Sequence, residues 1–190
     1  MHEESGQHKH SVHFYEDSVS LCRIVGGFLG SGLSSGAPAI IIATPTHREQ
    51  ILFNLIERSI DVQKARRAGE LVVLDVDDTL GAFMLDGTPD AALFDSYMSA
   101  ILAQVMRVRP RATIRAYGEM VDVLWKAGRA EAAIKLETRW NALAARHPFS
   151  LLCGYSIGQF YKQPEFFDQV CAQHDAVIDS GPDSVVRRSA

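Results

Sequence analysis

Short apolar runs alternate with longer amphipathic segments along most of the chain. The apolar runs are rich in β-branched residues, which is typical of strands buried on both faces. They predict strands over 11–15, 39–43, 71–75, 113–117, 149–153 and 176–178. The amphipathic segments have apolar residues at helical spacing and predict helices over 18–31, 46–58, 62–68, 91–108, 118–127, 130–146 and 164–173.

Strands that alternate with helices in this way predict an α/β fold, a three-layer sandwich with a mainly parallel sheet flanked by helices. We expect one domain over 11–178, with flexible polar tails at 1–10 and 179–190. The segment 77–89, rich in Asp and Gly, is predicted as a loop. Right-handed crossovers place the loops that follow parallel strands along one edge of the sheet, where ligands bind.

Composition narrows the class of protein. The chain has 190 residues, 47% of them hydrophobic, and a formal net charge of −4, which suits one globular domain and argues against a nucleic-acid partner. No apolar run approaches the roughly 18 residues that cross a membrane, and the start lacks a signal peptide. Three cysteines without a CxxC pair indicate neither a disulfide framework nor a zinc site. We therefore expect a cytoplasmic protein without a cofactor.

No group of His, Cys, Asp and Glu shows the spacing of metal ligands in the sequence. The histidines near the N-terminus, His8, His10 and His13, would bind a metal only adventitiously. We therefore expect no bound metal ion.

The first strand-to-helix turn, Tyr15-Glu16-Asp17-Ser18, contains neither glycine nor lysine. In nucleotide-binding α/β proteins this turn is rich in glycine, and its backbone N–H groups bind phosphate. Two carboxylates at this place would repel a triphosphate, so the sequence disfavours ATP or GTP hydrolysis. Glu16 and Asp17 are either an N-terminal helix cap or one polar wall of a small-ligand pocket.

The third predicted strand is followed by an acidic motif, Asp75-Val76-Asp77-Asp78-Thr79. It matches the first motif of haloacid-dehalogenase-type phosphatases, in which the first Asp is the nucleophile, the second is the acid/base, and magnesium lies between them. The later strand ends at 117–119 and 153–155 supply no acidic pair to complete the magnesium site. A magnesium-dependent phosphatase using Asp75 and Asp77 is the alternative hypothesis.

The other strand ends each allow two interpretations. Glu119 is a charge at a helix N-terminus or a pocket carboxylate, and His13 is a satisfied core residue or a ligand-binding group. Cys153 on an apolar strand is typical of a packed thiol. A redox sensor through Cys153 or Cys22 would need an accessible thiol of low pKa. An interaction module with a vestigial pocket also remains open.

Six segments in order resemble the MEDS (methanogen/methylotroph, DcmR) sensory domain. They are His13-Phe14-Tyr15-Glu16-Asp17 and the residues 36–45, 69–75, 115–120, 137–141 and 151–155. The resemblance extends over residues 11–178. It implies a strand order similar to that of RecA/KaiC-like ATPases, without the phosphate-binding loop.

The resemblance implies a bacterial, non-catalytic signalling domain that binds a small organic molecule at the carboxyl edge of the sheet. The signal would pass to a histidine kinase of a two-component system, to a transcription regulator, or within a homodimer. With Thr44 at the end of the second predicted strand, the candidate ligand-binding residues are His13, Tyr15, Glu16, Asp17, Thr44, Glu119, Cys153 and Tyr155.

Overall fold

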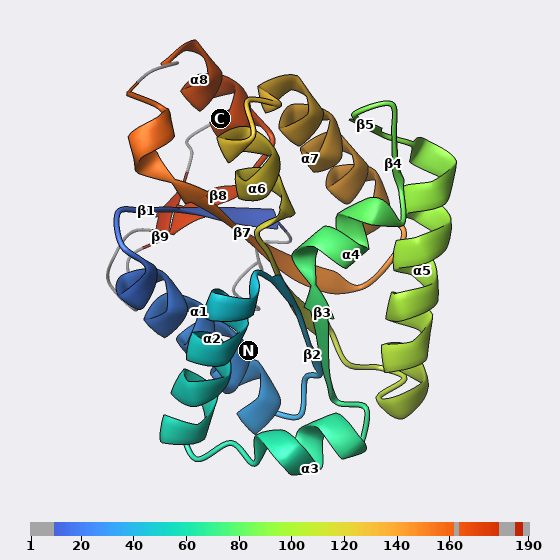
Figure 1. The fold of residues 1–190 in the computed structure, drawn as a ribbon. Coiled ribbons are helices and arrows are strands. Elements are labelled where there is room, and N and C mark those ends of the chain that lie inside the picture. The colour runs from blue at the N-terminus through green and yellow to red at the C-terminus, as the bar shows by residue number, and fades with distance from the viewer. Residues whose placement is uncertain (1–9, 162–163, 179–184, 188–190) are drawn as a thin grey trace.

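A seven-stranded sheet forms the centre of the structure, a computed structural model that describes residues 10–161, 164–178 and 185–187 (Figure 1). The strand order is β3-β2-β6-β7-β1-β8-β9. All neighbouring pairs are parallel except β8 and β9. The strands are β1 (His10–Tyr15), β2 (Ala39–Ala43), β3 (Leu71–Asp75), β6 (Ile114–Gly118), β7 (Phe149–Ser156), β8 (Ala176–Ile178) and β9 (Val185–Arg187).

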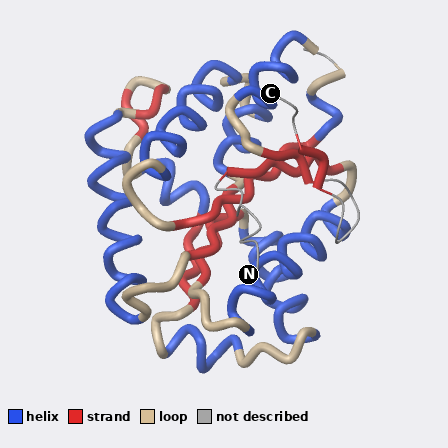
Figure 2. The backbone as a smooth tube through the Cα atoms, turned by 180° about the vertical axis from the view of Figure 1, so that it is seen from behind, coloured by secondary structure: helices blue, strands red, loops and turns tan. Residues whose placement is uncertain are grey.

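Helices cover both faces of this sheet, and Figure 2 shows the strands between the two helical layers. The first face packs against α1 (Ser18–Ser34), α2 (Pro45–Glu57) and α3 (Val62–Arg67). The second packs against α4 (Val76–Gly81), α5 (Ala91–Val108), α6 (Met120–Lys126), α7 (Ala130–Ala144) and α8 (Glu165–Ala172). The predicted three-layer α/β fold with a mainly parallel sheet is confirmed.

Alternation along each strand decides which side chains can meet, because neighbouring residues of a strand point to opposite faces. In β1, Val12 belongs to the core beneath α5–α7, whereas Tyr15 belongs to the core beneath α1 and α2. In β7, Cys153 and Leu152 divide between the two cores in the same way. Polar residues of one strand can therefore belong to two separate sites.

Local signals start several of the helices where the sequence places them. Asp17 is the N-cap of α1, and its side chain accepts a hydrogen bond from the Ser20 amide at 2.8 Å. Helices α1 and α2 lie close together at Gly26, where a Cβ would be only 2.7 Å from Asn54 Cβ. A larger residue at position 26 would push the two helices apart.

The segment 77–89 differs from the predicted loop. It contains the end of α4 and a hairpin of β4 (Met84–Leu85) and β5 (Thr88–Pro89). Asp75 caps α4 by accepting from the amides of Asp77 and Asp78, and Asp86-Gly87 forms the hairpin turn with positive φ at both residues. The Asp and Gly residues of this segment predict a loop. In the structure Asp77 and Asp78 lie in the first turn of α4, and Asp86 and Gly87 form a hairpin turn.

The domain boundaries also differ at both ends. His10, predicted to belong to a tail, is the first residue of β1 and pairs with Leu151. Residues 185–187, predicted as tail, form β9 beside β8. The remaining predicted tail residues, 1–9, 179–184 and 188–190, lie outside the described residues. Among the described helices, none is both long and apolar enough to cross a membrane.

Candidate functional site

A set of mostly buried polar side chains, in two hydrogen-bonded groups that meet where the rings of Tyr15 and His47 are in contact, lies at the carboxyl edge of the sheet, where β1, β2 and β6 end. It joins these strand ends to the first turns of α1 and α2 and to α6. We call it the edge cluster, and its members are Tyr15, Ser18, Thr44, His47, Tyr117, Glu119, Asp122 and Lys126.

Glu119 is at the centre of the edge cluster and only 1% exposed. One carboxylate oxygen accepts from the Thr44 amide at 2.5 Å; the other accepts from His47 Nδ1 at 2.5 Å and from the Tyr117 hydroxyl at 3.0 Å. Burial alone would raise the pKa of Glu119, but the hydrogen bonds from His47 and Thr44 lower it below its ordinary value. Glu119 is therefore a buried anion held by three donors.

The Tyr117 hydroxyl can reach Glu119 because Gly154, on the neighbouring strand β7, has no side chain in its way. A Cβ at Gly154 would lie 2.9 Å from the Tyr117 hydroxyl oxygen. Burial, together with the charge of Glu119, raises the pKa of Tyr117 well above its ordinary value, so the hydroxyl keeps its proton and donates. A side chain at position 154 would displace one of the three donors of Glu119.

The second half of the edge cluster connects to solvent. The Tyr15 hydroxyl donates to Asp122 Oδ2 at 2.7 Å, and Lys126 Nζ lies 2.7 Å from the same oxygen and 3.0 Å from the Tyr15 hydroxyl. Asp122 Oδ1 accepts from the Ser156 amide at 2.8 Å. The Asp122 side chain is 4% exposed, whereas that of Lys126 is 45% exposed. The group formed by Tyr15, Asp122 and Lys126 thus meets water at Lys126.

Ser18, His47 and Glu119 form a hydrogen-bonded chain. His47 Nδ1 must carry a proton because Glu119 only accepts, and His47 Nε2 lies 2.8 Å from the Ser18 hydroxyl oxygen. This is the connectivity of a Ser–His–acid triad. The two residues before Ser18, Glu16 and Asp17, are exposed carboxylates. Negative charge beside the serine opposes the anion that forms in acyl transfer.

The structure brings Tyr15, Thr44 and Glu119 together, as expected for strand ends along one edge. Glu16 and Asp17 lie in the adjacent turn, and Asp17 acts as the helix cap. His13 is buried on the same face of β1 as Tyr15, and its Nδ1 donates to the Ile178 carbonyl at 2.8 Å.

Cys153 and Tyr155, expected at the same pocket, lie on the opposite face of the sheet. Because β7 continues to Ser156, Cys153 is inside the strand rather than at its end. Both side chains point to Glu137 of α7: the Tyr155 hydroxyl donates to Oε1 at 2.9 Å, and Cys153 Sγ lies 3.5 Å from Oε2. The single predicted pocket is therefore two separate groups of residues.

The thiols are poor candidates for redox sensing. Burial raises the pKa of Cys22 to about 12, and the charge of Glu119 acts in the same direction. Burial and Glu137 raise the pKa of Cys153 well above its ordinary value. A redox sensor needs an exposed thiol of lowered pKa, and these two are buried with raised ones.

Asp75 of the acidic motif is already engaged within the fold. Its Oδ2 pairs with Arg48 at 3.0 Å, and its Oδ1 accepts from the amide of Asp77 at 2.9 Å. Asp77 itself is exposed. Asp75 thus serves as a helix cap and an ion-pair partner, and these contacts give no support to the phosphatase hypothesis.

Sequence reasoning missed several residues of the edge cluster. His47, Asp122 and Lys126 are not among the residues that the sequence predicts for the site. Asp122 is 3% exposed on α6, between the buried residues Val121 and Leu124. A carboxylate on an apolar helix face is the signal that could have identified it.

Comparison with known proteins agrees with the fold. The first turn of this α/β domain holds the carboxylates of Glu16 and Asp17 where nucleotide hydrolases have a glycine-rich phosphate loop. The family model described as "MEthanogen/methylotroph, DcmR Sensory domain" matches residues 9–175. The chain therefore belongs to the MEDS family of sensory domains, which confirms the resemblance seen in the sequence.

A solved structure supports the architecture. The crystal structure of the uncharacterized protein PH0321 from Pyrococcus horikoshii, in complex with an unknown peptide, is similar to this chain with a TM-score of 0.64. The two sequences are 12% identical, and the match covers 91% of this chain and 78% of the other. No match was found among curated proteins. At this identity the likeness concerns the fold alone.

Proposed function

We propose that this protein is a non-catalytic sensory domain that binds a small organic molecule at the edge cluster and passes the signal to a partner protein. Membership of the MEDS family supports the sensory role. The observation that carries the binding site is Glu119, a buried anion that accepts from Thr44, His47 and Tyr117 and is linked to Ser18 through His47. We propose the cytoplasm as its location, where thiols such as Cys22 stay reduced.

The edge cluster offers groups that can orient a polar ligand. Lys126 Nζ has three N–H donors, of which Asp122 and Tyr15 engage two. The Ser18 hydroxyl, half-buried beside His47, has lone pairs that can accept. A small molecule with one acceptor and one donor would satisfy both residues, while its apolar part gains from leaving water.

Three helices meet at this cluster, which gives a route for the signal. Ser18 is the first residue of α1, His47 belongs to α2, and Lys126 belongs to α6. A ligand that binds one arrangement of these helices more tightly would shift the population toward it. Helix α2 also exposes Phe53 and Ile56, at 59% and 58%. We propose that a histidine kinase, a transcription regulator or a second copy of the chain contacts this helix.

A thermal-shift experiment tests the proposal. We expect a panel of small alcohols, amines and carboxylates to contain compounds that raise the melting temperature of the wild type. Glu119→Gln should lose this rise, whereas Glu49→Gln, on the exposed side of α2, should keep it. If only magnesium nucleotides raise the melting temperature, or if Glu119→Gln responds like the wild type, the proposal is wrong.

Turnover assays separate sensing from catalysis. We expect no hydrolysis of an aryl phosphate with magnesium and none of an aryl ester. Phosphatase activity that disappears in Asp75→Asn would instead establish the alternative hypothesis. Esterase activity that disappears in Ser18→Ala would show that the Ser18–His47–Glu119 chain is catalytic. Either result would replace the sensory proposal.

A further inference from the structure

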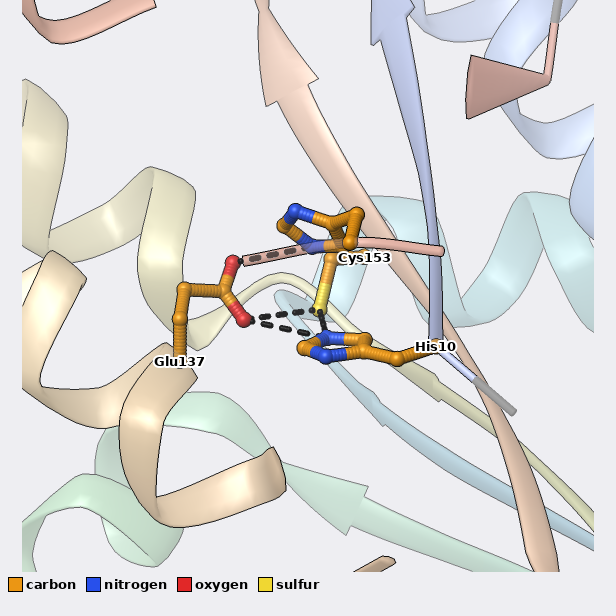
Figure 3. A group of neighbouring side chains, drawn as sticks. His10, Glu137 and Cys153 are labelled. Atoms are coloured by element: carbon orange, nitrogen blue, oxygen red, sulfur yellow. Dashed lines mark hydrogen bonds and ion pairs between the residues drawn. The ribbon is translucent and has the colours of Figure 1, made fainter. Parts of the chain in front are cut away.

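A second group of polar side chains lies on the other face of the sheet, and Figure 3 shows three of its members, His10, Glu137 and Cys153. Together with His174 they form a group that we call the core cluster, in which the four candidate ligand atoms lie within 4.8 Å of one another. The members come from β1, α7, β7 and the connection between α8 and β8. All four are buried.

The spacing of the core cluster fits four ligands around one ion. His10 Nε2 lies 3.1 Å from Glu137 Oε2 and 3.3 Å from Cys153 Sγ. Glu137 lies 3.5 Å from Cys153 Sγ through Oε2, and its Oε1 lies 3.3 Å from His174 Nε2. Zinc bonds of about 2.0–2.3 Å at tetrahedral angles put neighbouring ligand atoms about 3.3–3.6 Å apart. The side chains therefore need only small movements to close around a metal.

The protonation of the two imidazoles is set by their outer partners. His10 Nδ1 lies 2.8 Å from Asn141 Oδ1, and the amide nitrogen of Asn141 donates to the Gln173 carbonyl, which fixes the orientation of this amide. His174 Nδ1 lies 2.7 Å from the Val170 carbonyl. Both oxygens can only accept, so both Nδ1 atoms carry protons and donate. In the neutral rings the Nε2 lone pairs then point to the centre of the cluster.

The inward atom of His174 faces the carboxylate of Glu137. His174 Nε2 is buried without a hydrogen-bond partner among the described residues, and it faces an oxygen of Glu137 at 3.3 Å. A lone pair opposite a carboxylate is repulsive unless a proton or a cation lies between them. Histidine ligands of metals typically donate their other N–H to a carbonyl or carboxylate, as His10 and His174 do here.

From this geometry we infer that His10, Glu137, Cys153 and His174 bind one Zn²⁺ ion. Two imidazoles, one thiolate and one carboxylate are ligands that zinc takes in tetrahedral sites. The charge of the ion is balanced by Glu137 and by the Cys153 thiolate, so the buried site is neutral overall. Each zinc bound releases the thiol proton to water. Because all four ligands come from the chain, the site is structural and ties the last strands to the core.

The test uses the full chain without an affinity tag. The protein is unfolded with a chelator, refolded with one equivalent of Zn²⁺ or Co²⁺, desalted and analysed for metal. We expect one zinc per chain, and with cobalt a tetrahedral visible spectrum with a thiolate-to-metal charge-transfer band. Cys153→Ser and His174→Gln should retain little or no zinc. Asn141→Ala, which loses the outer partner of His10, should bind zinc about 10–100-fold more weakly.

Two controls address other sources of binding. Cys22→Ser removes a buried thiol on the opposite face and should keep the full zinc content. The double variant His2→Ala/His8→Ala should also keep it. Zinc that persists in both Cys153→Ser and His174→Gln is an adventitious ion only. That result, a wild type that retains no zinc, or cobalt without the thiolate band would each overturn the inference. The cobalt spectrum of the wild type decides the matter even if Cys153→Ser does not fold.

Discussion

The edge cluster and the core cluster are built on a common element and differ in where protons lie. In each, a buried glutamate accepts from a tyrosine hydroxyl and faces a histidine: Glu119 with Tyr117 and His47, and Glu137 with Tyr155 and His174. Glu119 also has a backbone donor, and the neighbouring group around Asp122 meets water at Lys126. In the core cluster, by contrast, the Nε2 atoms of two imidazoles, His10 and His174, face Glu137.

The contrast shows how one residue type can serve two purposes. The carboxylate of Glu119 already accepts from three donors and needs no bound ion. The other polar groups of the edge cluster can therefore bind a ligand. A carboxylate that faces imidazole lone pairs and a thiol needs a cation or protons between them. Burial would raise the pKa of Glu137, but the charge of His174 and the hydrogen bond of His10 lower it far below its ordinary value. The core cluster therefore depends on its carboxylate more strongly.

The largest expected effect is the loss of that carboxylate. In the presence of a chelator, Glu137→Gln should lower the free energy of unfolding by about 3–5 kcal/mol, because it leaves buried groups without their charged partner. Urea denaturation measures the change. Glu131→Gln, on the exposed face of α7, should stay within about 0.5 kcal/mol of the wild type. A loss below about 1 kcal/mol for Glu137→Gln would show that the two clusters do not differ in this way.

Removing one tyrosine hydroxyl from each cluster gives a finer comparison of their contributions to the free energy of unfolding. Tyr155→Phe removes the donor of Glu137 in a fully buried place and should cost about 2 kcal/mol. Tyr15→Phe leaves Asp122 paired with Lys126 and with the Ser156 amide, so it should cost about 1 kcal/mol. Urea denaturation of both variants checks the order. Equal losses would mean that access to water at Lys126 does not relieve the edge cluster.

The sequence was sufficient for the fold because apolar runs and helical spacing are strong local signals. It also located three of the eight members of the edge cluster, Tyr15, Thr44 and Glu119, since they lie where strands end at one edge. The faces of Cys153 and Tyr155 could not be predicted in this way. They depend on the length of β7, which is set by its pairing with β1, where Tyr155 lies beside Phe14.

The core cluster could not be predicted from the spacing of its residues along the sequence. His10 and Cys153 are 143 residues apart, and His10 was assigned to a tail. One local signal was present: Glu137 lies on the buried face of α7, with Ala133 and Trp140 one turn away on either side. A charged residue at such a position is rarely buried without partners, so it indicates a polar site beneath the helix.

A smaller effect separates the two interpretations of Asp17. Asp17→Ala should lower the free energy of unfolding by about 1 kcal/mol because α1 loses its N-cap, and Asp17→Ser should restore most of it. Denaturation of the three proteins measures this. If Asp17 acts only as a cap, ligands found by thermal shift should still stabilise Asp17→Ser. Loss of that response in Asp17→Ser would instead make Asp17 a wall of the ligand site and extend the edge cluster to the turn.

The smallest effect is a change in the slope of stability with pH, and it tests whether Glu119 is the satisfied anion that the comparison requires. The pKa of Glu119 is lowered on folding from its ordinary value of 4.5. Below that pH the unfolded chain binds a proton before the folded one does, so the wild type loses stability as pH falls toward the folded pKa. Glu119→Gln binds no proton at this position.

Glu119→Gln should therefore be less stable than the wild type at pH 7, and the difference should narrow as pH falls below about 4.5. Urea denaturation of both proteins between pH 7 and about 3 measures it. Glu137 contributes in the same direction in both proteins and so cancels from the difference. A difference that stays constant over this range would show that the donors of Glu119 do not favour its ionised form. In that case Glu119 would have no better set of hydrogen-bond donors than Glu137 has.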